Sequence, residues 1–294
     1  MESKEQSAPV RVLITGAQGF LGARLTQSLR QAEKKQKGGA VIALARSDMD
    51  LTNEDAVRRA VENAAPQLVF HCAAVSDTGL AEREPELSYA VNVRGTLHLA
   101  AACKDTGAKL VAMSSDQIYN GTLQSGPLAE TAPVQPQTVY GRHKLLAEQQ
   151  TLALLPQAVF LRLTWMYDLP KSPLRLNANL LCALCAAAQS GVPLHSPVHE
   201  QRGVTDVWQV VRALPRAACF AGGVYNFGSE NTLCAYDTAV AAARAMGLPQ
   251  ETVQAEERRY AKQPRNLSMD CAKARSAGVD FPDTVAGIAA ALAR

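Results

Sequence analysis

The sequence has no apolar run long enough to cross a membrane. Its longest runs, at residues 180–188 and 285–293, are nine residues each, whereas a membrane-spanning helix needs about 20. The first nine residues are polar, carry both signs of charge and contain no apolar segment of the kind found in signal peptides. We therefore expect a cytoplasmic protein in which residues 1–9 form a disordered tail.

A strong charge of either sign is also missing. Thirty Lys and Arg residues against 27 Asp and Glu residues leave a formal net charge of +3, so neither a nucleic-acid partner nor a membrane surface is predicted. Seven cysteines, an odd number without repeated spacing, do not indicate a disulfide framework. Cys182 and Cys185 form a C-x-x-C inside an apolar run, with no second Cys or His pair at zinc spacing. We predict buried thiols there and no metal site.

What the sequence does contain is a regular alternation of apolar and amphipathic segments, in a chain with 47% hydrophobic and 19% charged residues. Short runs rich in Val, Ile and Leu occur at residues 10–15, 40–45, 68–73, 109–113 and 158–163. Helix-like segments at 21–32, 53–63, 86–106 and 139–155 separate them. Such strands are typical of a parallel sheet covered by helices on both faces. The predicted fold class is α/β, with a doubly wound parallel sheet of the Rossmann type.

The pattern loosens after residue 167, where prolines interrupt it. We predict a dinucleotide-binding domain at residues 10–167 and a smaller substrate-binding lobe at 168–294. A strand-like run at 224–227 suggests that a segment of this lobe, about 203–228, returns to the main sheet. Helices are expected at 177–190, 205–218, 235–246 and from residue 283 onward.

A glycine-rich turn joins the first strand to the first helix. Gly16, Gly19 and Gly22 recur every three residues at this point. Such a turn lets the backbone approach a pyrophosphate, and the helix N-terminus attracts the anion. An ordinary Gly-rich turn is the alternative, because the spacing differs from G-x-G-x-x-G.

The end of the second strand bears on the choice of nicotinamide cofactor. An acidic residue that would bind a ribose 2′-hydroxyl is missing there, and Arg46 offers a guanidinium for a 2′-phosphate instead. This favours NADP(H) over NAD(H), with a solvated loop arginine as the alternative. Asp50 and Leu51 follow, where they could hold the adenine, although Asp50 could equally serve as a turn residue.

Three further residues suggest acid–base chemistry. Tyr140 and Lys144 are four apart and share one helix face. An adjacent ammonium group stabilises a phenolate, so we expect the pKa of Tyr140 to fall from its usual value of about 10. Ser115, at the end of the fourth strand, would hydrogen-bond the reacting carbonyl or hydroxyl and hold it beside the phenol.

With these residues the chain resembles the extended short-chain dehydrogenases/reductases, and among them most the dTDP-4-dehydrorhamnose reductases. The resemblance covers nearly the whole length and includes residues 71–76, 84–92, 114–116, 163–167, 200–205 and 264–270. The last three stretches are less general than the cofactor motifs, and they favour the reductase branch.

The resemblance implies hydride transfer from NADPH to the 4-keto carbon of a nucleotide-linked sugar. Tyr140 would protonate the alkoxide, Lys144 would also hold the nicotinamide ribose, and Ser115 would orient the ketone. It further implies cofactor contacts at Gly16, Gln18, Gly19, Phe20, Leu21, Cys72, Ala73 and Ala74. Substrate contacts are implied at Ser76, Asp116 and Trp165, with a packed core tryptophan as the alternative for Trp165.

One departure from the family pattern concerns the dehydratases of the same superfamily. Gln117 follows Asp116 where the reductases usually have tyrosine and where sugar-nucleotide dehydratases need a glutamate. Because an amide cannot act as that acid or base, dehydration is disfavoured.

Two other functions remain open on the same residues. One is a nucleotide-sugar 4-epimerase, which uses the same three residues but does not consume its cofactor. The other is a non-catalytic NADP-binding regulatory subunit, like that of methionine adenosyltransferase. A homodimer through the helices at 86–106 and 139–155 is compatible with the sequence, as is a monomer.

Overall fold

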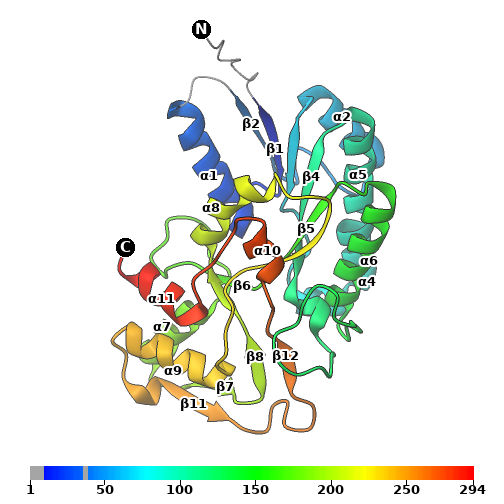
Figure 1. Ribbon diagram of the computed structural model, residues 1–294. Coiled ribbons are helices and arrows are strands. Elements are labelled where there is room, and N and C mark those ends of the chain that lie inside the picture. The colour runs from blue at the N-terminus through cyan, green and yellow to red at the C-terminus, as the bar shows by residue number, and fades with distance from the viewer. Residues whose placement is uncertain (1–9, 36–38) are drawn as a thin grey trace.

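The structure is a computed structural model that describes residues 10–35 and 39–294 (Figure 1). The predicted tail at residues 1–9 lies outside the described residues. Within those ranges, no helix combines the length and the apolar character needed to span a bilayer.

The described residues contain a six-stranded parallel sheet in the order β2-β1-β3-β4-β5-β10. Its strands are β1 (Arg11–Thr15), β2 (Ala40–Leu44), β3 (Leu68–His71), β4 (Lys109–Ser115), β5 (Val159–Leu163) and β10 (Gly223–Phe227). This confirms the predicted doubly wound fold. β10 comes from the C-terminal half of the chain and pairs with β5.

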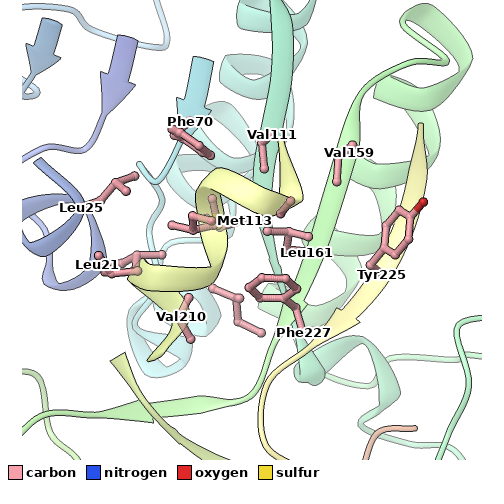
Figure 2. Close-up of a cluster of buried hydrophobic side chains, with 14 of the residues drawn as sticks. Leu21, Leu25, Phe70, Val111, Met113, Val159, Leu161, Val210, Tyr225 and Phe227 are labelled. Carbon is pink, nitrogen blue, oxygen red and sulfur yellow. The ribbon is translucent and has the colours of Figure 1, made fainter. Parts of the chain in front are cut away.

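Helices cover both faces of the sheet, as Figure 1 shows. On one face lie α1 (Phe20–Lys35) and α8 (Val207–Ala217), which contact each other. On the other lie α2 (Glu54–Ala64), α5 (Gly95–Thr106) and α6 (Val139–Leu154). Figure 2 shows the hydrophobic cluster on the α1/α8 side, where Leu21, Val210 and Phe227 pack together with other buried side chains. Burial on both faces explains why the strands are continuously apolar.

The segment between β3 and β4 is more broken than the sequence indicates. Instead of one helix over residues 86–106, the chain forms α3 (Thr78–Arg83), α4 (Pro85–Tyr89), a π-helical turn (Ala90–Arg94) and then α5. Pro85 sits in the first turn of α4, where its missing N–H group costs nothing. The π turn leaves Asn92 1% exposed, and π turns are frequent near functional sites.

A smaller lobe lies below the sheet in Figure 1. Its short strands pair in three two-stranded sheets, β6 (Trp165–Tyr167) with β9 (Val204–Asp206), β7 (Leu194–Pro197) with β11 (Val253–Glu256), and β8 (Glu200–Arg202) with β12 (Arg265–Leu267). Its helices are α7 (Leu180–Ser190), α9 (Ala235–Ala245) and α11 (Thr284–Leu292), whereas α10 (Ala272–Ser276) packs on β10 of the main sheet. Tyr167, Leu181, Leu184, Ala239 and Ile288 are among the residues of a separate apolar cluster in this lobe. The domain boundaries given above stay a prediction.

Candidate active site

The strand order reverses direction at β1, which has β2 on one side and β3 on the other. In open parallel sheets, ligands bind outside the carboxyl ends of the strands at such a reversal. Here the glycine turn follows β1 and the loop at residues 72–76 follows β3. Gly16 has a φ of +67°, and a Cβ there would lie 2.6 Å from the backbone nitrogen of Ala73. The turn and the loop therefore meet across the crevice, and this contact requires glycine.

The start of α1 fits a bound anion. The first N–H groups of a helix have no acceptor within the helix, and the first turn of α1 contains no acidic residue. Phe20 and Leu21 bury their side chains in the core cluster, at 7% and 6% exposure. They therefore offer main-chain groups to a ligand. Gln18 and Gly19 lie in the turn just before them. These residues fit the pyrophosphate of a dinucleotide.

The residues predicted to contact the adenosine end lie after β2. Arg46 is exposed, and its charge contributes to a lowered pKa of Asp50, although hydrogen bonds from Thr52 are the larger cause. The Asp50 carboxylate accepts from the backbone N–H of Thr52 at 2.9 Å and from its hydroxyl at 2.8 Å. Asp50 thus has the turn role given as its alternative. Leu51 is 6% exposed and packs in the core rather than standing open.

The three residues predicted for acid–base chemistry come together at the end of β4. Ser115 is the last residue of β4, and its side chain lies close enough to the Tyr140 phenol to lower the pKa of that group. The Lys144 ammonium group donates to the backbone carbonyl of Met113, also on β4, at 2.9 Å. The close packing of α6 on this strand end is permitted by Gly141, because a Cβ there would lie 2.5 Å from the Gln117 carbonyl oxygen.

The electrostatics of this trio differ from the expectation. Burial raises the pKa of Tyr140, against a smaller lowering by Ser115, with the Asp116 charge raising it further. The prediction that Lys144 lowers the pKa of Tyr140 is wrong for this structure. The Lys144 ammonium group donates to the Met113 carbonyl of β4 and lies 5.8 Å from the centroid of the Tyr140 ring. Burial also lowers the pKa of Lys144 to about 8.

His71, the last residue of β3, is buried, and Cys72 after it is half-buried. His71 bonds to the hydroxyls of Thr15 at 2.7 Å and Thr96 at 3.0 Å, and burial lowers its pKa to about 3. Burial raises the pKa of the Cys72 thiol to about 12. Both groups are therefore neutral near pH 7 and poor as acids, bases or nucleophiles. Ala73 and Ala74 are half-buried beside them.

Charged and amide groups surround the predicted substrate residues. The Asp116 carboxylate, 2% exposed, forms an ion pair of 2.7 Å with Arg202, whose guanidinium carbon lies 5.2 Å from the centroid of the Trp165 ring. Gln117 donates to Asp116 at 3.2 Å and accepts from Arg265 at 2.7 Å. These contacts join the end of β4 to β8 and β12 of the lobe. Ser76 is exposed on the loop after β3.

Arg202, Arg265 and Glu200 were not predicted as site residues. Glu200 lies 3.1 Å from Arg265 and 3.8 Å from Arg202, so it holds the two guanidinium groups in one cluster. The signal for them was present in the stretches at 200–205 and 264–270, which carry part of the family resemblance. In the described part of the chain, no group of three or more His, Cys, Asp or Glu side chains could hold a metal ion.

Comparisons with known proteins agree with this architecture. The model of the RmlD substrate binding domain family matches residues 10–294. A dTDP-4-dehydrorhamnose reductase from Streptomyces griseus is 38% identical over 189 residues, which cover 62% of this chain and 60% of that relative. The methionine adenosyltransferase 2 subunit beta of Xenopus laevis is 28% identical over 92% of this chain and 83% of its own length.

Among solved structures, the dTDP-4-dehydrorhamnose reductase of Bacillus anthracis in complex with NADP superposes with a TM-score of 0.84. The match covers 97% of this chain and 98% of that one at 22% sequence identity. At this identity the likeness shows a shared fold.

Proposed function

Since the chain belongs to the RmlD substrate binding domain family, we propose that it is an NADPH-dependent reductase of a nucleotide-linked 4-keto sugar. The Streptomyces relative, named as a dTDP-4-dehydrorhamnose reductase, supports a dTDP-linked substrate. The same assignment predicts a cytoplasmic enzyme. A homodimer through α5 and α6 stays a prediction.

The observation that carries the proposal is that Ser115, Tyr140 and Lys144 meet at the carboxyl end of β4, on the same edge of the parallel sheet as the glycine turn after β1. The exposed Arg46 supports the choice of NADPH, because a guanidinium group binds a 2′-phosphate through paired hydrogen bonds.

A reduced nicotinamide, when bound, supplies the hydride that the carbonyl carbon receives. Ser115, whose hydroxyl donates to Asp116 in the structure, is expected to turn that proton to the carbonyl oxygen and to hold this oxygen beside the phenol. Tyr140 donates its proton to that oxygen, so the ketone becomes a secondary alcohol. The raised pKa of Tyr140 suits this step, because the group starts as a protonated acid at neutral pH. Solvent then returns the proton to Tyr140, while the Lys144 ammonium group, with two N–H donors left beside its bond to Met113, would hold the nicotinamide ribose.

The substrate side of the crevice is expected to involve Trp165, Asp116 and Arg202. The Trp165 ring, stacked against the Arg202 guanidinium group, offers an apolar surface to a sugar ring. Asp116 accepts a hydrogen bond of 3.2 Å from the Ser115 hydroxyl and forms an ion pair with Arg202. It therefore connects Ser115, at the end of β4, to the lobe.

Replacing Tyr140 by Phe tests the proposal. We expect turnover of a dTDP-4-keto sugar to fall by about 10²–10⁴-fold, the usual contribution of a general acid, while NADPH binding measured by calorimetry stays nearly unchanged. Tyr236→Phe, on α9 in the lobe, is the matched control and should keep its turnover. Unchanged turnover in Tyr140→Phe would refute the assignment.

A non-catalytic cofactor-binding subunit is the second candidate, favoured by the likeness to methionine adenosyltransferase 2 subunit beta over 92% of this chain. For such a subunit we expect NADPH to bind but not to be consumed when any 4-keto sugar is added. We also expect a partner enzyme to be recovered with it in stoichiometric amount. The 4-epimerase alternative predicts protein that purifies with stoichiometric oxidised cofactor.

A further inference from the structure

His143 lies between the two residues of α6 that the proposed reaction uses, yet it faces away from them. Its Nδ1 is 2.9 Å from the hydroxyl of Ser88 on α4, and its ring meets the Tyr89 ring edge-on at 5.6 Å between centroids. Ser88 is completely buried. The imidazole is therefore part of the packing between α6 and α4.

A chain of hydrogen bonds leads from His143 to the loop that lines the crevice. The Asn92 amide donates to Ser88 Oγ at 3.2 Å and to the Val75 carbonyl at 3.0 Å. Its oxygen accepts from the Val75 N–H at 2.9 Å. The Asn92 side chain thus hydrogen-bonds both the N–H and the carbonyl of Val75. Val75 lies two residues after Ala73, which contacts the glycine turn.

The partners of Ser88 favour a neutral imidazole. Asn92 donates to Ser88 Oγ, so of the two partners only His143 Nδ1 can accept the proton of this buried hydroxyl. Only the neutral imidazole with its proton on Nε2 has an accepting Nδ1. A protonated His143 would donate to Ser88 instead and would leave the buried hydroxyl proton competing for the Asn92 oxygen that holds Val75.

We propose that His143 is a positioning residue that acts through Ser88 and Asn92. It holds the loop at 72–76 against the glycine turn and in register with Tyr140 and Lys144. Protonation of His143 loosens this link. The inference rests on the proposed cofactor site, because the loop is expected to line that site.

Charged groups around His143 act in both directions. Burial and the neighbouring Arg142 lower its pKa, whereas Glu86 on α4 and Glu82 on α3 raise it. The guanidinium carbon of Arg94 lies 5.9 Å from the centroid of the Tyr89 ring. Burial is the larger cause, so the imidazole is neutral at pH 7.5 and the link weakens only in acid.

The test measures NADP⁺ affinity by calorimetry at pH 7.5 and pH 5, with NADP⁺ chosen because it is stable in acid. His143→Asn keeps an acceptor at the position of Nδ1 that does not titrate. His143→Leu and Ser88→Ala remove the bond. His195→Leu, at an exposed position of β7, is the matched control. Melting temperatures establish that each variant is folded.

We expect wild-type affinity to fall between pH 7.5 and 5 by about three- to tenfold more than that of His143→Asn, the amount one neutral hydrogen bond contributes. His143→Leu and Ser88→Ala should be weakened by the same factor already at pH 7.5, and His195→Leu should match the wild type.

If wild type and His143→Asn change in parallel with pH, the inference is refuted while the cofactor site stands. This comparison decides the matter even if His143→Leu fails to fold. If no variant binds NADP⁺ at either pH, the proposed cofactor is refuted, and this inference with it.

Discussion

At Gly141 the helix that carries Tyr140 and Lys144 passes directly against the backbone at Gln117. Replacing a glycine by alanine inside a helix normally stabilises a protein by about 0.5–1 kcal/mol. Here the new Cβ would lie 2.5 Å from the Gln117 carbonyl oxygen, well inside the 3.4 Å at which ordinary contact begins. Such overpacking costs about 1–3 kcal/mol. The net expectation for Gly141→Ala is a loss of up to about 2.5 kcal/mol.

Relief of this contact requires α6 to move away from the end of β4, which separates Tyr140 from Ser115. A displacement of about 1 Å at reacting groups costs on the order of 100-fold in rate. A loss of 1 kcal/mol lowers the melting temperature of a protein of this size by only about 2–4 °C. We therefore expect a large fall in kcat, measured by loss of nicotinamide absorbance with a dTDP-4-keto sugar, together with a small shift in calorimetric melting temperature.

Gly287 provides the control for this substitution. It also lies inside a helix, α11, but the nearest atoms to its Cβ would be 3.7 Å away. Gly287→Ala should keep full turnover and gain stability of about 0.5–1 kcal/mol. If Gly141→Ala is as active and as stable as Gly287→Ala, the close packing of α6 on β4 does not position the trio, and the reasoning fails.

Three further predictions concern charge. Arg46→Ala should weaken NADPH binding by about 1.5–3 kcal/mol, the contribution of a charged hydrogen bond, and leave NADH binding unchanged; equal losses for both cofactors in calorimetric titrations would contradict the 2′-phosphate role. Burial lowers the pKa of Lys144 from 10.5 to about 8, so the ammonium group is lost above pH 8. The pH profile of kcat/KM should therefore turn down near pH 8. Stability responds in the opposite sense: in the unfolded chain Lys144 keeps its proton up to its ordinary pKa of 10.5, so between pH 8 and 10.5 its titration makes the fold more stable as pH rises. Arg202→Met leaves Asp116 buried without its ion-pair partner, which should lower the free energy of unfolding, measured in urea, by about 3–5 kcal/mol. Adding Asp116→Asn should restore most of this stability, and a double variant as unstable as Arg202→Met would refute the pairing.

The main sheet could be predicted from sequence because its signal is local. Each strand from β1 to β5 is a short apolar run, and burial on both faces makes such runs continuous. The helices of the lobe were predictable in the same way, but its short strands gave no such signal. β8 and β12 are three residues each and pair across more than 60 positions of sequence, so neither has a pattern of its own. The π turn at Ala90–Arg94 was missed for a related reason, since its residues are ordinary helix formers.

The trio was predictable because spacing and strand position carry it, as Tyr140 and Lys144 show. Their pKa values were not, because burial and the Met113 carbonyl depend on how α6 packs against β4. Arg202 shows the same limit. Its ion pair with Asp116 joins residues 86 positions apart, and only the folded lobe brings them together.

The proposed reaction is the reduction of a nucleotide-linked 4-keto sugar by NADPH, which is oxidised to NADP⁺. The most direct measurement is a titration of the purified protein with NADPH and NADH, followed by the change in nicotinamide absorbance on adding a small panel of such sugars. We expect tighter binding of NADPH than of NADH, and the oxidation of one NADPH for each molecule of one of these sugars that is reduced. Tight NADPH binding with no loss of absorbance on any of them would contradict it.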